Sequence, residues 1–326
     1  MTSTLNRLLG YEALRLPAGH ILCVEIDELA AALPGLRKDV TVTAFSTRRR
    51  AWLPPDLPPV RAVVMGFSPA KEQVKMQLAM LAEFLAPGTP LWLYGPGQTG
   101  IGSAPRLLEG DWTHIEKVGY GGHAEIWRAE LVETHPRAGL TAWQKYFVAD
   151  VACEAFRVVT LPGVFSHGEV DPGTRLLLEN LPLLPNKARV LDFGCGCGII
   201  AAFLKLRQPD LDVHGSDISA LALAASKATL KANLFEATLH LESEIGLLPG
   251  TFGAIISNPP FHVGQKVELA TARALISGAK SKLTKGGRLI LVANRFLPYR
   301  TAMEKEFGSV KVLADTPQYW VLSSTL

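Results

Sequence analysis

The residue types best suited to chemistry gather in the second half of the chain, and three of them are glycines of one turn. Gly194, Gly196 and Gly198 follow a short apolar run and precede a helical pattern. Glycines at the end of a strand let the backbone approach a ligand closely. A dinucleotide fingerprint, G-x-G-x-x-G, would need glycine where Ile199 stands. The spacing G-x-G-x-G favours a ligand without a pyrophosphate, such as S-adenosylmethionine (SAM).

Acidic residues near this turn are placed to bind the polar parts of such a cofactor. Asp192 is expected to face its ammonium end, directly or through water. Asp217 ends the next apolar run and can accept hydrogen bonds from both ribose hydroxyls. An N-cap role is the alternative for Asp217, although Ser219 is the better cap candidate. Glu244 is placed for the adenine edge, in competition with the two residues before it. The predicted cofactor-binding residues are Asp192, Gly194, Cys195, Gly196, Asp217, Ile218, Glu244, Phe165 and Asn258.

A tetrapeptide, Asn258-Pro259-Pro260-Phe261, supplies the second chemical feature. Proline has no amide donor, so the carbonyl groups here are not drawn into sheet pairing. The side-chain oxygen of Asn258 and the carbonyl of Pro259 can then accept from one NH2 group, while Phe261 offers a face for a flipped-out base. Two acceptors can pull the amine hydrogens out of plane and aim the nitrogen lone pair at a methyl donor. This is catalysis by orientation and electrostatics. The predicted catalytic residues are Asn258, Pro259 and Phe261, and the predicted substrate-binding residues are Pro260, His262 and Arg295.

The pattern around these residues predicts a regular alternation of strands and helices. Strands are expected at 188–193, 211–216, 237–242, 252–257, 287–293, 310–314 and 319–323, and helices at 174–181, 199–207, 219–233, 267–283 and 298–307. Consecutive βα units predict a doubly wound, mostly parallel seven-stranded sheet. The last two strands have no helix between them, which predicts an antiparallel strand at the edge.

The N-terminal part of the chain reads as an α/β unit of its own. Strands are expected at 20–26, 40–45, 61–67 and 90–95, with a helix at 71–85. The glycines that follow the last of these strands lack the spacing and the downstream acid of a nucleotide site. We therefore expect two domains, 1–150 and 151–326, both α/β.

Composition limits the class of protein. The chain has 326 residues and a net charge of +3, with more Lys and Arg than Asp and Glu from residue 186 onward, as a polyanionic partner would favour. No apolar run reaches the roughly 20 residues of a membrane span, and the N-terminus lacks the zones of a signal peptide. The four cysteines are too scattered for a disulfide framework, and Cys195 and Cys197 have no second ligand pair. A cytoplasmic protein without a metal site is the expectation.

Taken together, these segments resemble a known family. The string IISNPPFH (255–262) is similar to that of the ribosomal RNA guanine-N2 methyltransferases, which are class I SAM-dependent enzymes. Three further segments resemble the same family, most closely its members acting on 16S RNA: LPGVFSHGEVDPGTRLLL (161–178), VLDFGCGCGII (190–200) and LVANRFLPY (291–299). The resemblance is dense over 161–326 and thin before it. Gly253 and Glu244 depart from the residues usual in this family.

The resemblance implies two tandem Rossmann-like methyltransferase domains, the first degenerate and serving RNA binding or folding. It implies that Asp192, Gly194, Gly196 and Asp217 hold SAM, and that the Phe165-Ser166 loop covers it. Asn258, Pro259 and Phe261 would hold a guanine. Arg48-Arg49-Arg50 is a candidate phosphate contact or a solvated loop.

The leading hypothesis is therefore methyl transfer from SAM to the N2 amine of a guanine in 16S ribosomal RNA. The substrate would be the small subunit or an assembly intermediate, and the enzyme a monomer. Other enzyme hypotheses are guanine-N2 methylation of 23S RNA, or N-methylation of adenine N6 or a protein glutamine, for which Tyr or Trp is commoner than Phe261. A SAM-binding RNA chaperone without catalysis is the non-enzymatic alternative. A nicotinamide-dependent oxidoreductase is disfavoured by Ile199.

Overall fold

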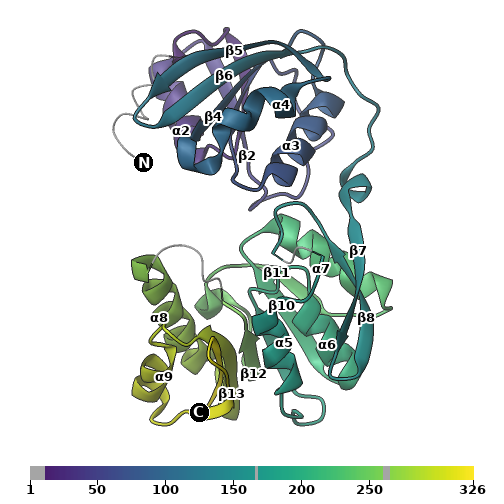
Figure 1. Cartoon of the computed structure of the whole chain (residues 1–326), viewed down its shortest axis with the longest axis vertical. Coiled ribbons are helices and arrows are strands. Elements are labelled where there is room, and N and C mark those ends of the chain that lie inside the picture. Colours follow the sequence, from purple (N-terminus) through teal and green to yellow (C-terminus); the bar gives the residue numbers. More distant parts are fainter. Residues whose placement is uncertain (1–11, 166–167, 260–264) are drawn as a thin grey trace. The chain divides into compact units, whose positions relative to one another are not determined.

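The computed structural model describes residues 12–165, 168–259 and 265–326. The chain divides into two compact units, Met1–Trp143 and Gln144–Leu326, each built around its own sheet (Figure 1). This division falls a few residues before the predicted boundary at residue 150. Among the described residues, no helix combines the length and the apolar character needed to cross a membrane.

The first unit contains a mixed six-stranded sheet in the order β2-β1-β3-β4-β6-β5. Its elements are β1 (Gly19–Val24), α2 (Asp27–Leu36), β2 (Val40–Phe45), β3 (Ala62–Gly66), α3 (Lys71–Phe84), β4 (Pro90–Pro96), α4 (Ala104–Leu108), β5 (Trp112–Gly121) and β6 (Ala124–Leu131). The four predicted strands and the predicted helix are all present. Helix α2 and the hairpin β5–β6 were not predicted. Strand β5 lies at the sheet edge and is largely exposed, so it lacks the apolar run that marks a buried strand.

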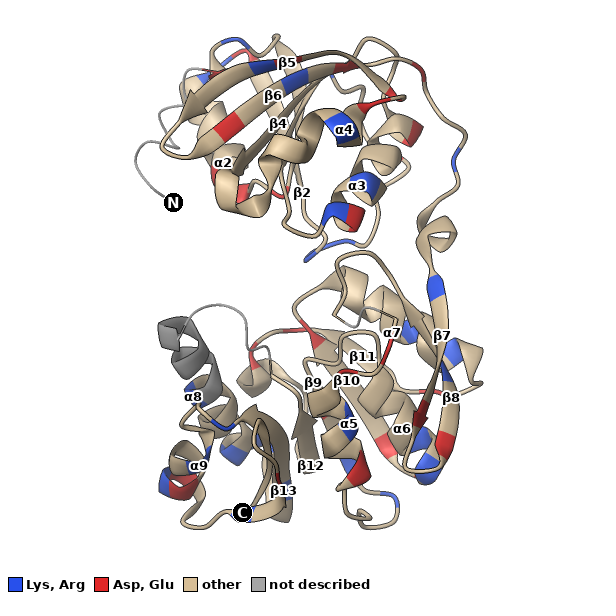
Figure 2. Ribbon diagram, in the orientation of Figure 1, with Lys and Arg blue, Asp and Glu red and all other residues tan. Residues whose placement is uncertain are grey.

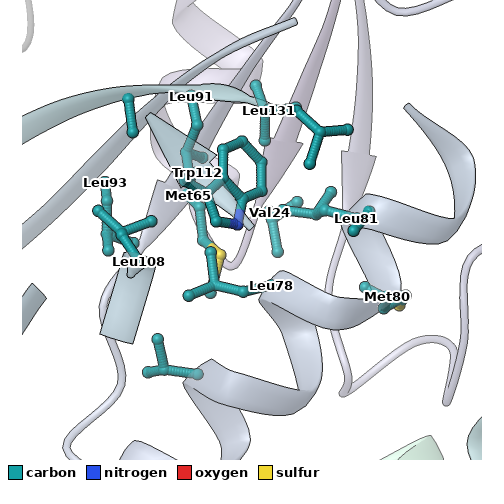
Figure 3. Packing of buried hydrophobic residues seen from close by; sticks show 14 of the residues in the cluster. Val24, Met65, Leu78, Met80, Leu81, Leu91, Leu93, Leu108, Trp112 and Leu131 are labelled. Carbon is teal, nitrogen blue, oxygen red and sulfur yellow. The ribbon is translucent and has the colours of Figure 1, made fainter. Parts of the chain in front are cut away.

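Alternate residues of the strands in this unit contribute to apolar clusters on opposite faces of the sheet. Leu22 and Val24 of β1 join the apolar cluster beneath α3 and α4, whereas Ile21 and Cys23 join the cluster beneath α2. Figure 3 shows the first cluster, where side chains of α3 and α4 pack with those of the strands around Trp112. Helices on both faces of a sheet are the arrangement expected for an α/β unit.

The second unit contains a seven-stranded sheet in the order β11-β10-β9-β12-β13-β15-β14. Its elements are α5 (Pro172–Glu179), β9 (Arg189–Phe193), α6 (Ile199–Arg207), β10 (Asp212–Asp217), α7 (Ala220–Ala232), β11 (Thr238–Leu241), β12 (Phe252–Ser257), α8 (Gln265–Lys282), β13 (Leu283–Asn294), α9 (Tyr299–Phe307), β14 (Lys311–Asp315) and β15 (Tyr319–Thr325). Every predicted strand and helix is present. The antiparallel strand is β15, which lies between β13 and the edge strand β14.

Helices cover both faces of this sheet (Figure 1). Helices α8 and α9 bury one face with apolar residues such as Leu275, Ile276 and Met303. Helices α5, α6 and α7 lie on the other side. Since β9, β10 and β12 are parallel neighbours, their carboxyl ends meet at one edge of the sheet.

A short antiparallel hairpin, β7 (Lys145–Val151) and β8 (Glu154–Thr160), precedes this sheet. The apolar run 156–166 predicts a strand that turns at Pro162-Gly163, which agrees with β8, whereas β7 was not predicted. The hydroxyl of Thr229 on α7 accepts from the backbone N–H of Val159 at 2.9 Å and donates to the Val159 carbonyl at 3.1 Å. Asn233 bonds the backbone of Arg157 in the same way, at 2.9 and 2.7 Å. Hydrogen bonds from Thr229 and Asn233 therefore hold the hairpin against α7.

Candidate active site

The glycine turn joins β9 to α6 at the carboxyl edge of the second sheet. Gly194, Gly196 and Gly198 have φ values of 75°, 53° and 80°, the left-handed region that favours glycine. A Cβ added at Gly194 or Gly196 would meet nothing within 4 Å, whereas at Gly198 it would lie 2.6 Å from the hydroxyl of Ser226. The turn thus presents open backbone at its first two glycines and packs against α7 at its third.

Asp217 ties this turn to the start of α7. One carboxylate oxygen accepts from the Gly196 N–H at 3.0 Å and the other from the Ser219 N–H at 2.9 Å. Ser219 caps α7 by accepting from the Ala222 N–H at 3.3 Å, as predicted. Burial raises the pKa of Asp217, while the backbone donors act in the opposite direction. A carboxylate has about four acceptor positions, so Asp217 keeps capacity for hydroxyl donors.

Asp192 lies at the end of β9 and is completely buried. One of its oxygens accepts from the Ala201 N–H in the first turn of α6 at 3.1 Å. The other is buried and has no partner among the described residues. Burial raises the pKa of Asp192 to about 8, with a further contribution from the Asp217 charge. Because the side chain has no exposed surface, neither a cofactor nor a bridging water can reach it in this structure.

Asn258 follows β12, the strand next to β9. The hydroxyl of Ser257 donates to the Phe193 carbonyl at 2.8 Å, which joins the ends of the two strands. Neighbouring strands lie about 5 Å apart. Asn258 and the turn at Gly194 are therefore brought to adjacent positions at the same edge, as the hypothesis requires.

The Asn258 carboxamide is held by two residues at the start of α5 that were not among the predicted site residues. Its NH2 group donates to a carboxylate oxygen of Asp171 at 3.0 Å and to the hydroxyl of Thr174 at 2.8 Å. Its oxygen is buried and has no partner in the described part of the chain. Asp171 is also the N-cap of α5, accepting from the Thr174 N–H at 3.0 Å. A sequence signal existed, because Asp-Pro followed by Thr marks a helix N-terminus, but it gave no hint of the contact with Asn258.

Comparisons with known proteins show the family to which the chain belongs. The Methyltransferase small domain family matches residues 155–323, and the Methyltransferase small domain N-terminal family matches residues 21–147. Ribosomal RNA small subunit methyltransferase C of Pseudoalteromonas atlantica is 37% identical over 258 residues, which cover 79% of this chain and 75% of that protein. The protein of the same name from Hahella chejuensis is 35% identical over 310 residues, 90% of each chain. The chain belongs to the ribosomal RNA small subunit methyltransferase C family.

A solved structure agrees with the fold of this family member over almost its whole length. The T. thermophilus 16S rRNA N2 G1207 methyltransferase, in complex with AdoMet and guanosine, matches with a TM-score of 0.80 over 98% of this chain and 91% of that chain, at 24% identity. The predicted family and the predicted tandem Rossmann-like fold are thereby confirmed.

Three of the other residues predicted to bind the cofactor have exposed side chains, whereas the side chain of Cys195 is buried. Phe165 and Ile218 are each 50% exposed, and Glu244 is exposed at the start of a short 3-10 turn. The thiol of Cys195 is buried: a Cβ added at Gly215 would lie 3.2 Å from its sulfur. Burial raises the pKa of this thiol well above its ordinary value. Cys195 can therefore contact a cofactor only through its backbone. No group of metal-ligating side chains is found among the described residues.

Besides Asn258, two of the residues predicted to act on the substrate, Pro259 and Arg295, lie in the described part of the chain. Pro260, Phe261 and His262 lie outside the described residues, and Pro259 is buried. Arg295 follows β13 and forms an ion pair with Asp315 at 2.5 Å. Its guanidinium also lies 5.2 Å from the centre of the Trp320 ring. A contact between Arg295 and substrate would require this exposed ion pair to open, at small cost.

The first sheet repeats the strand order of the second, so its corresponding edge can be compared. Residue Glu25 follows β1 as Gly194 follows β9, and it has φ of 54°. Its N–H donates to the Phe45 carbonyl at 2.8 Å, just as the Gly194 N–H donates to the Ser216 carbonyl at 2.8 Å. The first residues of the two turns therefore make the same backbone contact, although α2 begins two residues after Glu25 and α6 begins five residues after Gly194.

Their side chains differ. The Glu25 carboxylate accepts from the Ser46 hydroxyl at 2.9 Å, from the N–H and hydroxyl of Thr47 at 2.8 and 2.6 Å, and from the Gln77 amide at 3.0 Å. It spans the ends of β1 and β2, the region that a ligand would need. Gly66, at the end of β3, stands where the second unit has Asn258.

Proposed function

We propose that the chain transfers the methyl group of SAM to the exocyclic N2 amine of a guanine in 16S ribosomal RNA. The observation that carries this proposal is the Asn258 carboxamide, whose oxygen is left as a buried acceptor beside an open glycine turn. Family membership supports it. The fold relative from T. thermophilus, a 16S rRNA N2 G1207 methyltransferase in complex with AdoMet and guanosine, supports the same pairing of ligands.

The residues present fit the cofactor. The open backbone at Gly194 and Gly196 admits close approach, and the Asp217 carboxylate takes the ribose hydroxyls with its remaining acceptor positions. Asp192 would face the positively charged end of SAM, directly or through water, only after the turn opens, because its side chain is completely buried here. Ile218 and Glu244 border the adenine. The backbone of Cys195, the exposed ring of Phe165 and the Asn258 side chain complete the set.

To catalyse this reaction, the chain must orient the amine and stabilise the positive charge that develops on its nitrogen. The guanine N2 lone pair is delocalised into the ring and is weakly nucleophilic. The Asn258 side-chain oxygen and the Pro259 carbonyl accept from the two amine hydrogens and turn the lone pair out of the ring plane. Bound SAM supplies an electrophilic methyl group. With SAM bound, the methyl group would pass from its sulfur to N2, which would then lose a proton to bulk water. The two acceptors face the nitrogen as it becomes positive, so they stabilise the transition state more than the ground state.

The substrate side of the site extends the same proposal. Phe261 stacks on the guanine, and Pro260 and His262 border it. Arg295 contacts a phosphate when its ion pair with Asp315 opens. The substrate RNA lies within the small subunit or an assembly intermediate, and the enzyme acts as a cytoplasmic monomer.

For the first domain, taken as residues 1–150, we propose a degenerate methyltransferase-like unit that supports RNA binding or folding. The Glu25 side chain occupies the place of a cofactor, and Gly66 offers no amine acceptor. Arg48, Arg49 and Arg50 are exposed on the loop after β2 and can contact phosphates. Basic residues of the hairpin β5–β6 lie beside acidic ones in Figure 2, with ion pairs such as Lys117–Glu125 at 2.9 Å, and are less suited to that role.

The replacement Asn258→Ala tests the proposed function. Methyl incorporation into small subunits that lack the modification is expected to fall by about 100-fold or more, because one of two transition-state acceptors is lost. SAM affinity, measured by calorimetry, should fall far less than the rate, because Asn258 is only one of several residues that hold the cofactor. Asn186→Ala, which alters an exposed loop residue, is the matched control. Mass spectrometry of nuclease digests identifies the methylated atom.

Parallel assays separate the alternatives. Large-subunit RNA, DNA and a glutamine-containing protein substrate are offered beside small subunits, and NAD beside SAM in calorimetry. Full turnover by Asn258→Ala would exclude the assigned role of this residue. SAM binding without methylation of any substrate would favour the non-catalytic chaperone.

A further inference from the structure

An asparagine carboxamide can adopt two orientations, and only one of them serves an amine substrate. Rotation by 180° exchanges the oxygen, an acceptor, with the NH2 group, a donor. An NH2 group turned toward the guanine amine would face two donors and could not pull its hydrogens out of plane. Methyl transfer therefore depends on what holds Asn258 in one orientation.

At the start of α5 both partners of this carboxamide act as acceptors, and one of them, the Asp171 carboxylate, cannot act otherwise. The Asp171 carboxylate has no hydrogen to donate, and it also receives the Thr174 N–H at 3.0 Å. The Thr174 hydroxyl accepts from Asn258 at 2.8 Å, and its own hydrogen can turn toward the same carboxylate, 3.5 Å away. In the rotated orientation the Asn258 oxygen would face the Asp171 carboxylate, which cannot donate, and that hydrogen bond would be lost. The Thr174 hydroxyl would have to turn its hydrogen away from Asp171 to reach the rotated oxygen. Thr174 is buried, so water cannot readily replace the lost bond.

We propose that Asp171 and Thr174 are positioning residues for methyl transfer: they hold the Asn258 oxygen toward the target amine. This inference rests on the proposed function and extends it. The negative charge of Asp171 lies behind the carboxamide and polarises it toward its oxygen. As the amine nitrogen becomes positive, this polarisation strengthens the acceptor. The pair acts through Asn258 and touches neither the substrate nor the cofactor.

Two replacements at Thr174 test the inference with a matched control. Thr174→Val keeps the shape and removes the acceptor, and kcat is expected to fall by about tenfold, with KM for RNA and the SAM dissociation constant within about twofold. Thr174→Ser keeps the hydroxyl and is expected to restore most of the lost rate. A merely structural role would respond to side-chain volume, and would lower the rate in the serine variant at least as much.

Asp171 needs a variant that preserves the helix cap. Serine is a good N-cap but is too short to reach Asn258. Asp171→Ser is therefore expected to lower kcat by about 100-fold while leaving SAM affinity and the thermal midpoint close to those of the wild type. Loss of kcat, SAM affinity and thermal midpoint together would overturn the inference, because it would show that Asp171 acts only as the cap of α5.

The variants also separate this inference from the function on which it rests. A wild-type chain that methylates an amine other than guanine N2 would refute the proposed function. The order of rates among wild type, Thr174→Ser, Thr174→Val and Asp171→Ser on that amine would still test the positioning role. Equal rates for all four would refute the positioning role while leaving guanine methylation intact.

Discussion

Asp192 and Asp217 end neighbouring strands, yet their surroundings give them different properties. Asp217 is partly exposed and accepts from two backbone N–H groups, so it stays available to hydroxyl donors. Asp192 is fully buried, with one backbone donor for two oxygens. Desolvation of its charged form raises the pKa of Asp192 to about 8. At the scale of single residues, burial therefore decides which of the two aspartate side chains a ligand can reach.

The raised pKa of Asp192 predicts how stability depends on pH. In the unfolded chain an aspartate has a pKa of about 3.9. Between that value and 8 the folded protein holds a proton that the unfolded chain has released, so stability falls as pH rises. From pH 6.5 to 8 the free energy of unfolding is expected to decrease by up to about 2 kcal/mol. Urea titrations at several pH values measure it.

Asp192→Asn is the control, and it should lack most of this decrease. The pKa values of His214 and His240 are lowered, mainly by burial. Their contribution to stability is lost as pH falls below about 6.5 and still grows slightly just above it, so it opposes the decrease from Asp192 and offsets a small part of it at the lower end of the window. Equal slopes in the wild type and Asp192→Asn would assign the pH dependence to another group.

At the scale of elements, the junction of β9, α6 and α7 shows that glycines of one turn have separate tasks. Gly194 and Gly198 have nearly equal φ values, 75° and 80°. Beyond Gly194 there is open space, but Gly198 lies against Ser226 of α7. One glycine leaves room for a ligand, and the other lets two helices approach.

This difference predicts opposite profiles for two alanine variants. Gly194→Ala adds only the strain of a left-handed alanine, about 1 kcal/mol, and is expected to weaken SAM binding more than it weakens the fold. Gly198→Ala adds that strain and a clash at 2.6 Å with the Ser226 hydroxyl, so a larger loss of stability is expected, about 3 kcal/mol. Chemical denaturation and calorimetry measure both. Similar losses of stability in the two variants would contradict the packing role of Gly198.

At the scale of the whole molecule, the two units share one strand order. The first sheet, β2-β1-β3-β4-β6-β5, matches β10-β9-β12-β13-β15-β14 of the second, which adds β11 at its edge. Their site edges differ in chemistry, because the Glu25 carboxylate fills the first with its own hydrogen bonds. The same strand order therefore carries a candidate active site in the second unit, whereas in the first unit the Glu25 side chain closes the corresponding edge.

This comparison predicts one SAM bound per chain and a structural role for Glu25. Glu25→Gln replaces an acceptor oxygen by an NH2 group that faces donors, and is expected to cost about 1–3 kcal/mol of unfolding free energy. Binding stoichiometry and methylation should be unchanged. Asp27→Asn, an exposed change in the first turn of α2, is the control. Two SAM molecules per wild-type chain in calorimetry would contradict the closed edge.

The sequence by itself determined the elements whose signals are local. Helix α6 begins and ends where it was predicted, at Ile199 and Arg207, and β12 spans the predicted 252–257. The glycine turn and Asn258 could be placed at strand ends for the same reason. Period, glycine spacing and proline act over a few neighbouring residues. Strands β5 and β7 are largely exposed and lack an apolar run, and both were missed, as were β6 and the helices α2 and α4.

Only the tertiary structure decided which distant groups meet. Asn258 meets Asp171 and Thr174, 87 and 84 residues away, because α5 packs at the edge where β12 ends. Asp192 turns toward α6 and becomes buried, and Glu25 closes the edge of the first sheet. Such pairings depend on strand order and on which face each helix covers. Local propensity does not encode either, so the orientation of the acceptor oxygen could not be derived from the sequence.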